Sequence, residues 1–246
     1  MAVNLTISGS GGSLRTTPRT VNTWIRNSTW LAMPTVLSTD QKVVGLYGVT
    51  NDSSNFVALT CGGAYTVDWG DGTAPQNYAT GVTAYYKYDY ASINSTLTSA
   101  GMKQVLVTIT PQNGQNLTTV NLNVKHNQTG LPDSVGVNWL DLVIAGSNIS
   151  SLTIGGSAVT LGICERVRIL SHAAWTGVQT ATMFQHMFAL QYVSLDLTGS
   201  TVTSTAYMFL NCFSLTNVNN IIFVTSNVTN MSAMFIGCTS LTSVPL

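Results

Sequence analysis

Hydrophobic and polar residues alternate with a period of two along much of the first half of the chain. Such alternation is typical of strands that bury one face of a sheet. It predicts strands over Lys42–Val49, Phe56–Leu59, Tyr65–Trp69, Gln104–Thr110 and Leu117–Val124. We therefore expect the first half of the chain to form a β-sandwich.

The second half carries an internal repeat. The pattern Met-Phe-x-x-(Cys/Met)-x-(Ser/Ala)-Leu-x-x-Val begins at Met183, Met208 and Met234, so its copies are 25 and 26 residues apart. This period falls in the range of leucine-rich solenoids, in which each coil has a short strand and a helical or irregular return. We expect Met and Phe to enter the core from a short helical turn, and Leu and Val to enter it from the strand.

Length and composition divide the chain and limit its partners. The 246 residues suggest two domains, which we place at 38–127 and 128–246 after an N-terminal arm of residues 1–37, with the Met-Phe repeats in 180–246. No apolar run approaches the ~20 residues of a membrane-spanning helix. Only 7% of residues are charged, nine basic against nine acidic, so we expect neither nucleic-acid binding nor membrane insertion.

The turn after the third predicted strand carries a family signature. The run Trp69-Gly70-Asp71-Gly72-Thr73 is followed by Tyr88-Asp89-Tyr90-Ala91 and then by an alternating Val/Thr strand. This order resembles the PKD domain family, although the segment Ile93–Met102 departs from the short turn usual there. The resemblance implies an immunoglobulin-like sandwich that acts as a spacer or interaction module.

The Met-Phe coils, including Thr225–Phe235, resemble BspA-like leucine-rich repeats of bacterial surface proteins and some phage proteins. That resemblance implies a β-solenoid used for binding. The expected fold is therefore all-β: an immunoglobulin-like PKD-type sandwich followed by a leucine-rich-repeat-like β-solenoid with short helical turns.

Titratable side chains are too sparse for a recognisable catalytic site. The chain has one glutamate, eight aspartates and three histidines, and it lacks zinc, nucleophile-elbow and phosphate-loop motifs. We expect no enzymatic activity and no cofactor. Asp68, Asp71 and Asp89 are weak calcium candidates, and the alternative we favour is that Asp71 and Gly72 only make a turn while Asp68 faces solvent.

Two segments are candidates for contacts with partners. Trp24 and Trp30 lie in a polar arm, where they either anchor the chain to a partner or cover the open end of the sandwich. Val244, Pro245 and Leu246 fall inside a repeat without a polar cap. Because solenoid ends need caps, we expect this end to be an interface or a truncation.

The four cysteines are too few for a disulfide scaffold. Cys212 and Cys238 occupy the same repeat position, which would place them about 5 Å apart. They could form a disulfide in an oxidising compartment, but a reduced and buried ladder is the favoured interpretation because the first repeat has Met187 there.

These features favour a non-enzymatic virion protein of a bacteriophage, such as a head decoration, neck or fibre component. Its partners would be other virion proteins or copies of itself, with a host-surface ligand as a further candidate. The first 20 residues lack the apolar segment of a secretion signal, consistent with synthesis in a host cytoplasm. The alternatives are a bacterial surface adhesin or lipoprotein fragment, and a glycan-binding accessory domain that uses Tyr85, Tyr86 and Tyr88.

Overall fold

The computed structural model describes residues 24–53, 55–126, 136–156 and 161–244. Within these ranges the chain is all-β, with fourteen strands in three sheets and no helix. The predicted boundary between residues 127 and 128 lies outside the described residues, as do Pro245 and Leu246.

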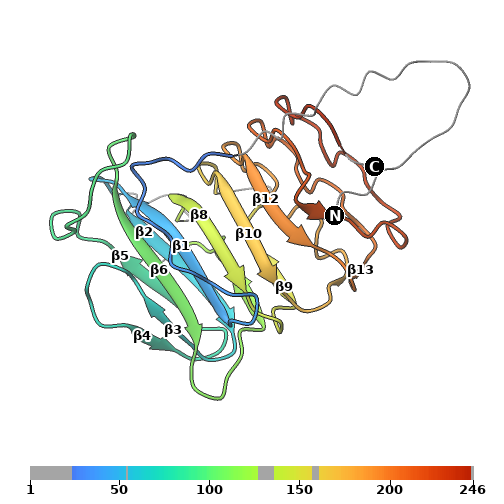
Figure 1. Ribbon diagram of the computed structural model, residues 1–246. Helices are drawn as coiled ribbons and strands as arrows, with labels where there is room; N and C mark the ends of the chain where they lie inside the picture. The colour runs from blue at the N-terminus through green and yellow to red at the C-terminus, as the bar shows by residue number, and fades with distance from the viewer. Residues whose placement is uncertain (1–23, 54, 127–135, 157–160, 245–246) are drawn as a thin grey trace, which may run out of the picture.

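The largest sheet has eight strands in the order β14-β12-β10-β8-β1-β6-β3-β4 (Figure 1). In that order the strands are β14 (Ile221–Ile222), β12 (Tyr192–Asp196), β10 (Arg166–Ser171), β8 (Trp139–Ala145), β1 (Lys42–Val49), β6 (Lys103–Pro111), β3 (Tyr65–Asp68) and β4 (Gln76–Tyr78). Pairing is antiparallel from β4 to β8 and parallel from β8 to β14. Strand β8 therefore joins an antiparallel half to a parallel, solenoidal half.

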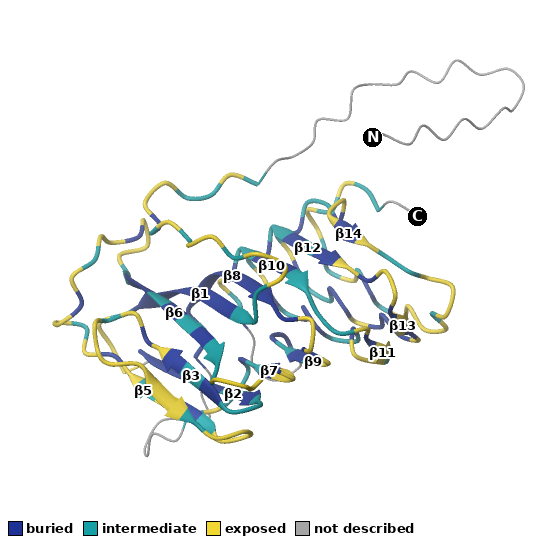
Figure 2. Ribbon diagram, turned by 60° about the horizontal axis from the view of Figure 1, so that its bottom comes forward, coloured by how far each residue is buried: buried dark blue, intermediate teal, exposed yellow. Residues whose placement is uncertain are grey.

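The two smaller sheets face this one. The four-stranded sheet has the order β5 (Thr83–Lys87), β2 (Phe56–Gly62), β7 (Thr119–Asn121) and β9 (Ser151–Thr153). Its first three strands are antiparallel, and β9 joins β7 in parallel. The two-stranded sheet pairs β11 (Thr176–Gly177) with β13 (Thr201–Val202) in parallel, so both halves have strands on each side of the core (Figure 2).

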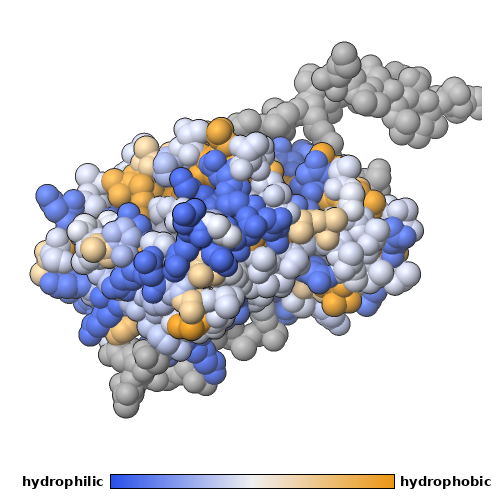
Figure 3. Space-filling model, turned by 90° about the horizontal axis from the view of Figure 1, so that it is seen from below, coloured by the Kyte–Doolittle hydropathy of each residue, from blue (hydrophilic) through white to orange (hydrophobic). Residues whose placement is uncertain are grey.

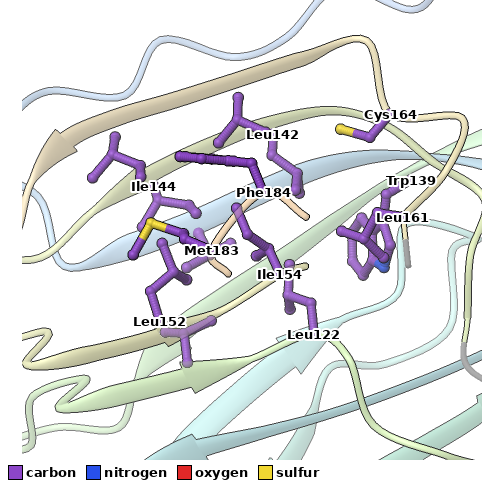
Figure 4. Packing of buried hydrophobic residues seen from close by; sticks show 14 of the residues in the cluster. Leu122, Trp139, Leu142, Ile144, Leu152, Ile154, Leu161, Cys164, Met183 and Phe184 are labelled. Atoms are coloured by element: carbon purple, nitrogen blue, oxygen red, sulfur yellow. The ribbon is translucent and has the colours of Figure 1, made fainter. Parts of the chain in front are cut away.

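One hydrophobic core runs through both halves. It extends from Val43 on β1 to Met234 in the repeats, and Trp139, Leu142 and Phe184 meet near its middle (Figure 4). On β8, Leu142 and Ile144 belong to the core, and Asp141 and Val143, which alternate with them, face the other side of the sheet. The solenoid therefore continues the layers of the first half instead of starting a separate core.

The strand predictions differ in how well they match. Strand β1 has the predicted bounds, and β2, β3 and β6 fall on predicted segments. Strand β7 covers only three residues of the predicted Leu117–Val124. Strands β4 and β5 were not predicted, because their short and largely exposed segments carry no hydrophobic alternation.

Candidate interaction surface

The three Met-Phe repeats stack as consecutive coils of the solenoid. Phe184 and Phe209 are fully buried, with ring centroids 5.1 Å apart, and Phe209 and Phe235 are 5.6 Å apart. The repeat leucines and valines of the first two coils are buried as well. Each coil therefore covers the apolar side of its neighbour, as a solenoid requires.

The Met-Phe segments are runs of tight turns, where a short helical turn was expected. In the first repeat the amides of Met183, Gln185 and Met187 donate to carbonyls three residues earlier. Left-handed residues recur before each Met and two positions after each Phe: Thr182, Tyr207 and Ala233, then His186, Asn211 and Gly237. A regular helix cannot form because positive φ interrupts it in every repeat.

In the first two repeats the remaining amides of these turns donate to carbonyls of the following coil. Phe184 N donates to Met208 O at 3.0 Å, and Phe209 N donates to Met234 O at 2.9 Å. The residues two positions before and after each Phe do the same. Each coil therefore presents N–H donors on its outer side and carbonyl acceptors on its inner side, so this part of the stack has a fixed polarity.

The outer side of the last described coil, residues 219–244, is open; we call it the open face. Phe235, Cys238, Leu241 and Val244 are only partly buried, although their counterparts in earlier coils are buried. A pocket of about 270 Å³ opens here, lined mainly by apolar side chains that include Leu197, Ile221, Phe223, Met234, Phe235 and Val244.

The open face also has unused backbone donors. Ala233, Phe235 and Gly237 occupy the positions whose amides bridge the earlier coils. Among the described residues, none accepts a hydrogen bond from these three amides. The open face therefore combines an apolar hollow with a row of N–H donors. Elsewhere, Figure 3 shows a face on which hydrophobic residues form small separate patches among polar ones.

The predicted interface residues have different locations. Val244 lines the pocket of the open face. Trp30 is buried against Leu46 and Leu140 on the outer side of the large sheet, and Trp24 packs against Trp30 and Tyr192. The arm crosses the strands of that sheet (Figure 1), so its tryptophans contact this chain's own sheet.

The carboxylates of the three calcium candidates accept hydrogen bonds from nearby residues. Asp68 accepts from the amide of Gly70, and Asp89 accepts from that of Ala91. Asp71 accepts from both the amide and the hydroxyl of Thr73 and also from the Tyr86 hydroxyl. In the described part of the chain, no three His, Cys, Asp or Glu side chains are grouped so that they could hold a metal ion.

The tyrosines of the glycan hypothesis do not share one open surface. Tyr88 is buried, Tyr86 stacks on Trp69 at 4.7 Å, and Tyr85 is 38% exposed. Sequence reasoning missed a second aromatic pair, Phe188 and Phe213, each 44% exposed and stacked at 5.3 Å. Their shared position, four residues after the repeat Phe, was a usable signal.

The cysteines are free thiols. Cys212 Sγ donates to the carbonyl of Phe184, and Cys238 Sγ donates to that of Phe209, each at 3.0 Å. Burial raises the pKa of both thiols, to about 11 for Cys238. Their chemistry is that of buried structural thiols and not of nucleophiles.

The histidines lie apart, each beside an aromatic ring. His126 stacks on Phe56, His172 stacks on Trp175, and His186 lies near Phe188. No helix within the described ranges has the length and apolar character needed to span a bilayer. The chain matches no protein family, no curated protein and no solved structure.

Proposed function

We propose that this chain is a non-enzymatic structural protein of a bacteriophage virion that binds another polypeptide through its open face. In this proposal the first half is a PKD-type immunoglobulin-like sandwich, and the second half is a leucine-rich-repeat-like solenoid. The observation that carries the contact proposal is the pairing, in the last described coil, of an apolar pocket with three unused amides.

The chemistry of the open face indicates its occupant. Three N–H donors at alternate positions need a row of acceptors, and a polypeptide backbone supplies carbonyl oxygens with that spacing. The apolar pocket beside them suits the side chains of the same segment. The expected partner segment therefore adds to the solenoid as a further coil would, with its carbonyls toward Ala233, Phe235 and Gly237.

The polarity of the donors also limits self-association. A two-fold dimer through the open face would bring one row of N–H donors against an identical row, and neither would find acceptors. The favoured partner is thus a different surface, on another virion protein or on another part of a second copy.

The virion setting rests on composition and resemblance. Charged residues make up only 7% of the chain, so the polar surface depends on uncharged side chains, and the turn and repeat motifs resemble those of phage structural proteins. Mass spectrometry of purified phage particles from the source tests this directly. A fixed ratio to the major capsid protein is expected. Absence from particles together with recovery in a cell-envelope fraction would favour a bacterial adhesin instead.

Two substitutions test the open face. Val244→Asp places a carboxylate in the pocket, whereas Ile236→Asp changes a side chain on the same coil that is 60% exposed and outside the pocket. In particles assembled with each variant, we expect incorporation to fall at least tenfold for Val244→Asp and to stay unchanged for Ile236→Asp. Circular dichroism establishes that both variants are folded. Equal incorporation of the two folded variants would exclude the open face as the contact.

A further inference from the structure

Three arginines of this weakly charged chain converge on the outer side of the large sheet. Arg166 and Arg168 alternate along β10, and Arg26 reaches the same place from the arm. The chain has only nine basic residues in all. A third of them therefore lies around one pocket.

Asp141 on β8 neutralises part of this charge. Its side chain is fully buried and accepts from Arg26 Nε at 3.2 Å and from Arg166 Nε at 2.8 Å, with a second bond from Arg166 Nη2. Arg26 also donates to the carbonyls of Trp30 and Leu31. Each of the three guanidinium nitrogens of Arg26 thus makes one hydrogen bond, and together these bonds hold the arm on the sheet.

Arg168 has no such partner. Its Nε is buried and makes no hydrogen bond with any described residue. Burial lowers the pKa of Arg168, and the neighbouring Arg166 charge adds to this effect. The other carboxyl of this region, Glu165, lies beside the Trp24 indole. Even with Glu165 counted, the guanidinium groups outnumber the carboxylates.

A pocket of about 410 Å³ lies between these arginines and arm residues 32–36; we call it the arginine pocket. Thr35 adds a hydroxyl to its wall, and Met33, Pro34 and Val36 add apolar surface. Ser194 on β12 is the register partner of Arg168, which places a second hydroxyl-bearing residue beside it. The pocket therefore offers guanidinium groups, the Thr35 hydroxyl and an apolar rim.

We propose that the arginine pocket binds a small oxyanion, a carboxylate or a phosphate, with Arg168 as its main ligand and the remaining Arg166 amino group as its second. A guanidinium matches either anion with two parallel N–H bonds. Such an anion would supply the missing negative charge beside Arg166 and Arg168. This inference does not depend on the proposed role in virions.

Titration followed by NMR at the arginine Nε–H resonances tests the site. The full chain is titrated separately with acetate and with inorganic phosphate, and sodium chloride keeps the ionic strength constant. We expect a saturable shift of the Arg168 Nε–H signal, which is assigned by its absence in Arg168→Lys. Saturation by acetate alone identifies a carboxylate site, and saturation by phosphate alone identifies a phosphate site.

Variants make the result specific. Arg168→Gln should weaken binding at least tenfold, Arg168→Lys should weaken it less because the charge remains, and Lys87→Gln, an exposed cation elsewhere, should leave it unchanged. Binding by the variants is read from the remaining Arg166 and Arg26 signals. If Arg168→Gln does not fold, Arg168→Lys decides. Shifts that do not saturate, that chloride abolishes, or that Arg168→Lys leaves unaltered would mean an adventitious ion only and would overturn the proposal.

Discussion

The rings of Phe184 and Phe209 lie parallel, with centroids 5.1 Å apart and planes 6° apart, although the residues are 25 positions apart in the chain. Their separation is close to the ~4.8 Å spacing of neighbouring strands. Phe235 continues the stack beyond Phe209 at 5.6 Å and 1°. Phe209 thus has a stacked aromatic neighbour on each side, whereas Phe235 has one among the described residues and borders the open face.

This difference predicts unequal costs of truncation. Phe209→Ala should lower the free energy of unfolding by about 3–5 kcal/mol, because a fully buried ring leaves a cavity between two coils. Phe235→Ala should cost clearly less, because its ring is only partly buried. Urea denaturation of the two variants and the wild type measures both values. Equal losses of unfolding free energy in the two variants would contradict the difference in burial between Phe209 and Phe235.

The repeat could be predicted from the sequence because each position that faces the core requires an apolar residue. Met, Phe, Leu and Val recur wherever a side chain enters the core, and the structure places Phe184 and Phe209 there as expected. The backbone between them was not readable. Its left-handed residues are Thr182, His186, Tyr207, Asn211 and Ala233, most of which give no hint of positive φ. For that reason a helical turn was predicted where linked tight turns occur.

The candidate sites depend on contacts that no local pattern encodes. The network of Arg26, Asp141 and Arg166 joins the arm to two strands, and Arg26 and Asp141 are 115 residues apart in the chain. Likewise, the pairing of β1 with β8 continues one sheet through both halves, whereas the two motifs considered singly suggested two cores. Val244 was identifiable because its repeat position marks it as apolar.

The turn between β3 and β4 predicts different costs at its two glycines. Gly72 has φ +89° with open space around the position of a Cβ, whereas a Cβ on Gly70 would lie 2.5 Å from the carbonyl oxygen of Leu106. Gly72→Ala should therefore cost about 1–2 kcal/mol through backbone strain alone. Gly70→Ala should cost more, since β6 must shift as well. Thermal or urea unfolding compares the stability of the two variants. Equal losses of stability would show that β6 can shift at no energetic cost.

Asp71 and Tyr86 predict a pH-dependent contribution to stability. Burial alone would raise the pKa of Asp71, but hydrogen bonds from Tyr86 and Thr73 outweigh it and lower the pKa below its ordinary value of 3.8. Because the folded-state pKa is the lower one, this stabilisation is complete above the unfolded-state pKa and is lost as the pH falls through the folded-state pKa.

Tyr86→Phe tests this coupling, because the stacking ring stays and the donor is removed. The Asp71 pKa, followed by NMR of its carboxyl carbon, should rise in the variant. The variant should lose about 1 kcal/mol at neutral pH, a small value because the pair is only partly buried. That loss should shrink as the pH falls below the ordinary Asp pKa. A loss independent of pH would assign the effect to packing instead of the hydrogen bond.

The thiols of Cys212 and Cys238 predict a reactivity pattern that also reports their redox state. In the folded protein Cys212 is buried and Cys238 is half-buried, and a pKa of about 11 leaves Cys238 mostly protonated. At pH 8 about one Cys238 side chain in a thousand is then a thiolate, the reactive form. A disulfide-exchange reagent should therefore modify Cys238 slowly and before the other thiols. Cys238→Ser should remove this first phase.

The number of thiols that react after unfolding reports the redox state. In urea all four cysteines should react, because all four are free in the structure. If only two thiols react, a disulfide between the stacked pair would be the explanation, and the Sγ–H bonds to the carbonyls of Phe184 and Phe209 would not exist in that form of the protein.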